Sequence, residues 1–416
     1  MAGDSAAESR WRLVKKIDFV AIPPDAAHWQ AMLDLVSRVF SGSGYWEFLN
    51  GCRQWYIEGS HYDVGASRIG ILDRRVVTHW GVWDYRMRIG RCAVRVGGIG
   101  AVSTHGECRQ RGLMFRTGQD SIQAMRRLGY DFTILFGIRG FYHRFGYVRA
   151  WPEQGFNMNT PDVEISTRGQ APTMRRFGLM DREGVDRLYN RYHAGLTGTA
   201  IRPTYTTPKA DFGGAKYHGW LWPSGRRPGG FVVVCPRENA LNLIDEAGEP
   251  EDVLAALGKL AAKHRCREIR MGLHADSALA RLLRRLSCRV EMHYFRDGGP
   301  MIRTINLPSA LRKIAPELSR RLKSSTLAAW RGALLVADSR ERAMLKIDRG
   351  RLAVGPPAKT AHAVRGGDEV ARLLIGSAEP EEVVEAGRMR LSGDAAKLVR
   401  VLFPAQRPML QSWDRF

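Results

Sequence analysis

Apolar and polar residues alternate along the first third of the chain with the periods of helices and strands. In residues 28–40, HWQAMLDLVSRVF, the apolar positions Met32, Leu35, Val36 and Val39 share one helical face, which predicts an amphipathic helix. Three strand-like runs follow, RIGILD, VVTHWGVWDYRMRIG and RCAVRVGGIGAVS. A second helix is expected after Gly112, and a further apolar strand, DFTILFGI, comes after it. Strands and helices in this order predict a mixed sheet of α/β type.

A second segment repeats this alternation. It contains the strand-like runs GGFVVVC, ALNLIDE and EIRMGL, and the helix-like runs EPEDVLAALGKLAAKH and DSALARLLRRLS. The run FVVVC leads into another strand and not into a glycine-bearing helix start, which is the one difference from the first segment. The stretch MNTPDVEISTRGQAP, at residues 158–172, is rich in Pro, Gly and Thr and is interpreted as a linker or loop.

A third segment runs to the end of the sequence. ALLVADSRERAMLKIDRGRLAVG predicts hairpin strands, and GDEVARLLIG, EPEEVVEAG and SGDAAKLVRVLFP predict helices. A chain of 416 residues is long enough for two or three domains. We therefore expect an α+β protein with α/β-type mixed sheets and domains at residues 1–153, 154–300 and 301–416.

The composition is that of a globular protein with a basic balance. Net charge is +22, but the positive residues are scattered in doublets such as Arg74-Arg75, which favours solvated faces. No helix-turn-helix, zinc or aromatic-basic motif accompanies the charge, so a nucleic-acid partner is not expected. None of the six cysteines is spaced as C-x-x-C, so we expect free thiols and no metal. The sequence shows no apolar leader and no long apolar run, and we expect a cytoplasmic protein without a membrane span.

One stretch, HGECRQRGLMFRTGQ at residues 105–119, joins a strand to a helix through cations and a glycine. The first backbone N–H groups of a helix have no partner within it, and the helix dipole adds positive charge there. Arg109 and Arg111 can add more charge, and Gly112 lets the backbone approach a ligand closely. The stretch therefore suits a diphosphate. A basic loop that merely enters an amphipathic helix explains the same pattern, so both interpretations stay open on the residues alone.

The order strand, R-x-x-G-x-small, helix, strand resembles the acetyl-CoA motif of the GNAT superfamily of N-acetyltransferases. It is carried here by Arg109, Gln110, Arg111, Gly112, Leu113 and Met114, and Met114 departs from the usual small residue. Three further runs resemble the enhanced intracellular survival (Eis) family of acetyltransferases: GFYHRFGYV, PMIRTINLPSAL, and LLIGSAEPEEVVEAGRMRL with the terminal LFPAQRPMLQSWDRF. The resemblance covers nearly the whole chain in the same order.

The resemblance implies a GNAT domain, a degenerate GNAT-like domain and a sterol-carrier-like domain, in a subunit that assembles as a homo-hexamer. It implies acetyl-CoA as the co-substrate, bound at its diphosphate by the R-x-x-G-x-x stretch. The pantetheine arm would then lie along Ala101, Val102 and Ser103 and beside Gly137 and Ile138.

The resemblance also implies two catalytic groups. Tyr142 in FYHRFGY matches the family's general acid, and the C-terminal carboxylate, here that of Phe416, matches its general base. A phenol with a pKa near 10 suits protonation of a leaving thiolate whose pKa is about 8.5, and an amine with a pKa of about 10.4 must lose a proton to attack. The N–H of Ser103 is a candidate oxyanion donor. Tyr147 is expected only to pack, and His143 is a rival base.

The acceptor implied is an amine of a small molecule or of a lysine. A polycationic acceptor such as an aminoglycoside would be repelled by the positive field unless acids such as Asp34, Glu47 or Asp414 dominate the pocket. The alternative function is a non-catalytic scaffold that binds a lipid or a partner through the sterol-carrier-like domain.

Overall fold

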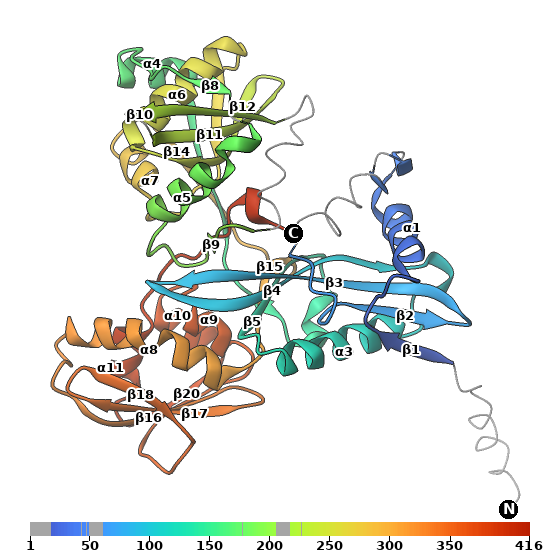
Figure 1. The fold of residues 1–416 in the computed structure, drawn as a ribbon. Helices are drawn as coiled ribbons and strands as arrows, with labels where there is room; N and C mark the ends of the chain where they lie inside the picture. The colour runs from blue at the N-terminus through green and yellow to red at the C-terminus, as the bar shows by residue number, and fades with distance from the viewer. Residues whose placement is uncertain are drawn as a thin grey trace, which may run out of the picture.

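The computed structural model describes residues 18–42, 44–46, 48–49, 61–176, 178–204, 217–225 and 227–416. These residues build three mixed sheets with helices packed on their faces (Figure 1). The expected α+β fold with mixed sheets is therefore confirmed. No helix in the described ranges has the length and apolarity needed to cross a bilayer.

The first sheet has the strand order β1-β2-β3-β4-β5-β15-β6, with β9 added beside β3. Its strands are β1 (Phe19–Ile22), β2 (Arg68–Leu72), β3 (Arg75–Ile89), β4 (Cys92–Thr104), β5 (Phe132–Gly137), β6 (Val148–Arg149), β9 (Ala200–Ile201) and β15 (Gly299–Thr304). The three strand runs expected before Gly112, and the one expected after it, are β2, β3, β4 and β5. Strand β15 lies at the expected boundary near residue 300, yet it pairs with β5 and β6 and so completes the first sheet.

Two helices cover opposite faces of this sheet. Side chains alternate along each strand, so each helix meets every second residue of the strand beneath it. Helix α1 (Trp29–Phe40) packs its buried Met32, Leu33 and Val36 on the face that carries Trp83. Helix α3 (Leu113–Arg127) packs on the face that carries Trp80 and Val82. Both helices were predicted, and their apolar stripes face the sheet as the spacing requires.

The second sheet has the order β14-β7-β13-β12-β11-β10-β8. Its strands are β7 (Glu153–Asn159), β8 (Arg175–Arg176), β10 (His218–Ser224), β11 (Arg227–Arg237), β12 (Ala240–Ala247), β13 (Glu268–Met271) and β14 (Arg289–His293). Its helices are α4 (Thr160–Thr167), α5 (Arg182–Tyr192), α6 (Pro250–Lys263) and α7 (Ala278–Leu283). None of the residues that the structure describes in this unit lines the cavity of the first sheet.

One expectation in this unit is wrong. The stretch at residues 158–172 was interpreted as a linker or loop, but Thr160–Thr167 form helix α4. Pro161 in the first turn and Asp162 beside it are typical of a helix start, and Val163 is fully buried. A β-carbon at Gly258 of α6 would lie 3.0 Å from Val163, so the two helices touch closely there.

The third sheet has the order β18-β17-β16-β19-β20. Its strands are β16 (Arg331–Ala337), β17 (Arg342–Asp348), β18 (Arg351–Gly355), β19 (His362–Arg365) and β20 (Arg390–Ser392), and its helices are α8 (Leu307–Lys323), α9 (Val370–Leu374), α10 (Pro380–Ala386) and α11 (Ala395–Leu402). The predicted hairpin strands and the three predicted helices are all present.

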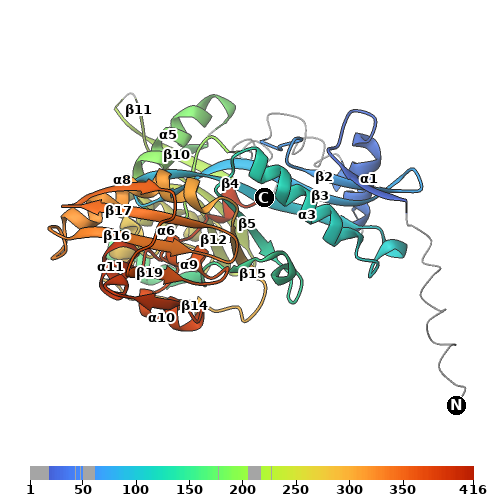
Figure 2. The same ribbon diagram turned by 90° about the horizontal axis from the view of Figure 1, so that it is seen from below.

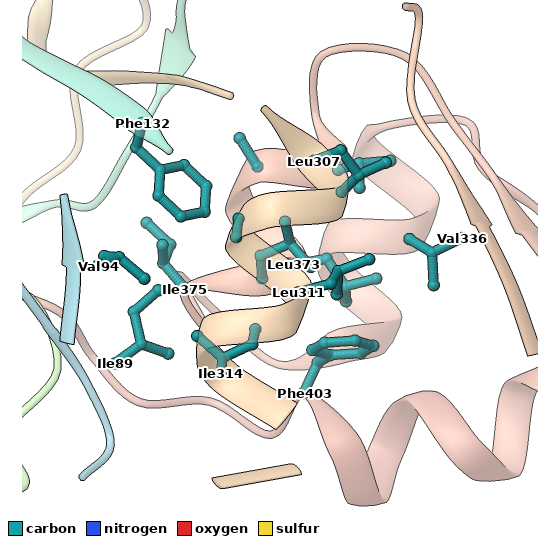
Figure 3. Close-up of a cluster of buried hydrophobic side chains, with 14 of the residues drawn as sticks. Ile89, Val94, Phe132, Leu307, Leu311, Ile314, Val336, Leu373, Ile375 and Phe403 are labelled. Atoms are coloured by element: carbon teal, nitrogen blue, oxygen red, sulfur yellow. The ribbon is translucent and has the colours of Figure 1, made fainter. Parts of the chain in front are cut away.

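Helix α8 joins the first and third sheets through one continuous core. Leu307, Leu311 and Ile314 of this helix lie between Phe132 of the first sheet and Val336 of the third (Figure 3). This shared core fixes the third unit to the first as a single packed body. The last residues after α11 then run back past the second unit, and the C-terminus lies near the middle of the first sheet (Figures 1 and 2).

Candidate active site

The site begins where two parallel strands part. Strands β4 and β5 pair from Val96 with Phe132 to Ile99 with Leu135, and their pairing ends there. Strand β4 nevertheless continues to Thr104 and β5 to Gly137. A cavity of about 720 Å³ lies at this opening, and residues from β4, β5, α1 and the start of α3 line it.

The loop between β4 and α3 forms one wall of the cavity. The first hydrogen bond of α3 runs from the Arg116 N–H to the Gly112 carbonyl, so the N–H groups before Arg116 are not used by the helix. Gly112 has φ +72° and open space around its missing β-carbon. The backbone conformation, and not crowding, therefore requires glycine here, and the space beside it is free for a ligand.

Tyr142 lies in a short 3₁₀ helix, Tyr142–Phe145, and its ring is largely enclosed by aromatic neighbours. The ring contacts Phe141 and Trp80 edge-on, with centroids 4.9 and 6.0 Å away. Burial raises the pKa of Tyr142 to about 12, so the phenol carries its proton at neutral pH. A β-carbon at Gly137 would lie 2.5 Å from the Tyr142 ring, and glycine at that position lets the ring lie against the end of β5.

The two other ionisable candidates in FYHRFGY lie outside the cavity lining. Tyr147 is buried, and its hydroxyl forms a hydrogen bond 3.0 Å long with the Thr133 hydroxyl. His143 is about half exposed and places Nε2 2.5 Å from Asp297, while its Nδ1 lies 3.1 Å from the Tyr147 carbonyl. Tyr147 is therefore packed in the interior, as expected. The position of His143 outside the cavity lining and beside Asp297 weakens the case for His143 as the base.

Phe416 lies on the opposite face of β4 from α3. Its ring covers Gly98, where a β-carbon would collide with it, and its carboxyl carbon lies 3.1 Å from the β-carbon position of Gly100. The ring also packs near Tyr85 and Phe136, with centroids 5.7 and 6.0 Å away. Phe416 and Tyr142 both line the cavity, although they lie far apart in the sequence.

Most residues expected to bind the co-substrate line this cavity; they are Ala101, Val102, Arg109, Gln110, Arg111, Gly112, Leu113, Met114 and Ile138. Ser103 and Gly137 do not. The Ser103 side chain is buried and donates to the Ala101 carbonyl at 2.9 Å. The same carbonyl lies 2.8 Å from Nδ1 of His79, and burial lowers the pKa of His79 to about 4. A neutral imidazole thus supports the strand behind the cavity.

Sequence reasoning missed several residues of the lining, among them Val39, Phe40, Ile99, Gly100, Phe136, Phe141 and Arg144. The run GGIGAVS was predicted only as part of a strand. The spacing of two between its glycines places Gly98 and Gly100 on one face of a strand, which was the available signal for a close approach by another segment.

The charged side chains that line the cavity are positive. Arg109, Arg111 and Arg144 line it, and no acidic side chain of the described chain does. Asp34 is bound by Arg38 at 2.8 Å and by Tyr45 at 2.5 Å. Asp414 is buried with Arg202, and Glu47 lies outside the described residues. This cavity therefore favours a polyanion such as a coenzyme A diphosphate.

Residues 22–150 match the family model described as an acetyltransferase (GNAT) domain. Strands β2 to β6 and helix α3 with its basic start thus lie in a segment that is similar to GNAT acetyltransferase domains. No relative was found among the curated proteins.

The fold of the whole chain is similar to solved structures at low sequence identity. A GCN5-related N-acetyltransferase from Kribbella flavida has 18% identity and a TM-score of 0.74, over 96% of this chain and 99% of that one. A GCN5-related N-acetyltransferase from Anabaena variabilis has 14% identity and a TM-score of 0.74, over 94% and 99%. Eis1 from Mycobacterium abscessus has 14% identity and a TM-score of 0.66, also over 94% and 99%.

Proposed function

We propose that the protein is an Eis-like enzyme that transfers acetyl from acetyl-CoA directly to a primary amine. The observation that carries the proposal is that Tyr142 and Phe416 line one cavity together with the basic helix start of α3. The third unit would then be the sterol-carrier-like domain of such enzymes. A homo-hexamer stays a prediction, which a mass measurement in solution would test.

The residues present fit the co-substrate. The unused N–H groups at the start of α3, with Arg109 and Arg111, would hold the diphosphate. The end of β4, at Ala101 and Val102, pairs with no strand on its β5 side and would offer backbone groups there to the pantetheine amides. Acetyl-CoA would supply the acetyl thioester on which the amine acts.

In the proposed reaction, a C–N bond forms and the thioester C–S bond breaks. The Phe416 carboxylate accepts the proton that the attacking amine loses. Tyr142 donates its proton to the leaving thiolate, which its high pKa permits because the phenol stays protonated until then. Phe416 is suited to the first role because its carboxyl group lies over Gly100 inside the cavity.

The acceptor we propose is a small-molecule amine or a lysine side chain that carries little further positive charge. Three arginines line the cavity, and they would oppose a polycation such as an aminoglycoside. Thiol release from acetyl-CoA should be measured across small arylamines, lysine peptides and aminoglycosides. Turnover with an amine from the first two groups would support the proposal. Absence of acetyl-CoA binding by calorimetry would contradict it.

A further inference from the structure

The end of the chain is held by the second unit over several residues. The Met409 N–H donates to the Thr197 carbonyl at 3.2 Å, and the Ser412 hydroxyl donates to the Ile244 carbonyl at 3.2 Å. Trp413 meets Tyr217 edge-on, with centroids 5.6 Å apart, and Arg415 lies 2.8 Å from Glu153. The C-terminal residues therefore follow a defined path between the first and second sheets.

A further contact of the C-terminal residues joins the Arg202 guanidinium to the Asp414 carboxylate. The Arg202 Nε and Nη2 atoms donate to the two carboxylate oxygens of Asp414, each at 3.0 Å. Nη1 of the same guanidinium donates to Asp245 of β12 at 2.6 Å. All three side chains are 1% exposed or less. The Thr204 hydroxyl also donates to Asp414, at 2.9 Å.

Arg202 is itself held in place by the first sheet and by α5. It follows strand β9, whose Ile201 pairs with Arg86 of β3. Asn190 of α5 accepts from the Arg202 N–H at 3.0 Å and donates to its carbonyl at 2.7 Å. The Tyr189 ring lies against the guanidinium, 3.5 Å from its carbon to the ring centroid. One residue thus connects the first sheet, through the backbone of β9, with the second sheet and the end of the chain, through its guanidinium.

A buried charge pair of this kind contributes little net stability, since the cost of removing both ions from water offsets their attraction. Its bidentate geometry instead fixes one orientation. Asp414 and Phe416 are two residues apart, so the position of one limits the other to within about 7 Å. The orientation of Asp414 therefore limits where the Phe416 carboxylate can lie over Gly100.

We propose that Arg202 is a positioning residue, which acts through Asp414 to hold the Phe416 carboxylate in the cavity. This inference rests on the proposed function for its catalytic consequence, but not for the anchoring. It gives the second unit, none of whose described residues lines the cavity, a part in the reaction: together with β9 it holds the terminal base in place.

The test uses two readouts on the full chain. The first is release of Phe416 by carboxypeptidase A, followed by mass spectrometry, which reports whether the end of the chain is anchored. The second is kcat and KM for acetyl-CoA. The variants are Arg202→Met and the milder Asp414→Asn, which keeps the shape of the side chain.

The matched control is Lys313→Met. Lys313 lies 2.5 Å from the buried Asp131, so this change also removes a cation from a buried carboxylate. Asp131 bonds to Ser309 and Arg95 as well, and none of these residues belongs to the last segment. The control therefore reports the effect of lost stability alone.

We expect both test variants to release Phe416 about tenfold faster or more and to lower kcat by about 100-fold, the cost of a displacement near 1 Å. KM for acetyl-CoA should change little, and the control should change neither readout. The inference would be overturned if folded Asp414→Asn protein released Phe416 at the wild-type rate and kept the wild-type kcat. If the proposed function is wrong, the results differ in another way. A chain extended beyond Phe416 would keep its turnover, while Arg202→Met would still accelerate the release of Phe416 by carboxypeptidase A.

Discussion

The carboxyl carbon of Phe416 lies 3.1 Å from the place that a β-carbon on Gly100 would occupy. Gly98, two residues earlier on the same face of β4, lies directly under the Phe416 ring. The strand thus lacks side chains at the two positions where the last residue of the chain approaches it. This relationship places a carboxylate in the lining of the cavity and can be tested by adding one methyl group to the strand.

Gly98→Ala should displace Phe416 and lower kcat by about 100-fold, because an error near 1 Å in the position of a catalytic group costs about that much. The new methyl group would collide with the ring of Phe416. Steady-state kinetics with acetyl-CoA and the best amine from the panel would measure the effect.

Gly97→Ala is the matched control, because Gly97 points to the other face of the same strand. Its β-carbon would lie 2.7 Å from the sulfur of Met125 and 3.1 Å from Val82. We expect a loss of stability of about 1–3 kcal/mol from overpacking with kcat largely kept. Equal loss of kcat in both variants would mean that Gly98→Ala acts through the core and not through Phe416.

Addition of one alanine after Phe416 should reduce turnover by at least about 100-fold, since it replaces the carboxylate in the cavity by a neutral amide that cannot accept a proton. Binding of acetyl-CoA, measured by calorimetry, should persist because the diphosphate site at α3 is unchanged. Full turnover of the extended protein would direct attention to another base.

The sequence predicted the parts of the site that are local along the chain. Periodicity located α1, β4, α3 and β5, and the residues of 109–114 line the cavity as expected. It could not predict that Gly98 and Gly100 meet Phe416, because their partner is at the far end of the chain. A glycine pair of period two within an apolar strand indicates close approach, but it does not name the approaching segment.

Two further differences have physical causes. The stretch that contains α4 carries Pro161 and Asp162, which are signals of both a turn and a helix start, and tertiary packing of Val163 decides between them. The acid Asp245 within the apolar run ALNLIDE was not singled out. A charged residue at a buried strand position requires a partner, yet only the fold shows that the partner is Arg202.

Tyr142→Phe should lower kcat by tenfold to a thousandfold, the range of general acid catalysis. The control is Tyr147→Phe, which removes a hydroxyl that bonds to Thr133 outside the cavity, and it should keep kcat. Thiol release under saturating acetyl-CoA would measure both variants. Equal turnover in the wild type and Tyr142→Phe would remove this tyrosine from the mechanism.

The pH dependence gives an independent check on Tyr142. An acid must be protonated to act, and burial raises the pKa of this phenol from 10 to about 12. Loss of the proton from Tyr142 should therefore not reduce kcat between pH 7 and about pH 11. A decline in kcat centred near pH 10, present in the wild type and absent in Tyr142→Phe, would show that the hydroxyl titrates at its ordinary value and is more exposed than the structure indicates.

The diphosphate site can be tested with a pair of glycines at the two ends of α3. Gly112 and Gly129 have φ of +72° and +78°, and neither has an atom within 4 Å of its missing β-carbon. Alanine at either position should lower the stability by about 1–2 kcal/mol, because the backbone there is left-handed.

Only Gly112 of this pair lines the cavity. Gly112→Ala alone should therefore also raise the Kd for acetyl-CoA, by about tenfold, because relaxation of the loop misdirects the N–H groups at the helix start. Calorimetry on both variants would measure this difference. Equal affinities in the two variants would mean that the coenzyme does not bind at the start of α3.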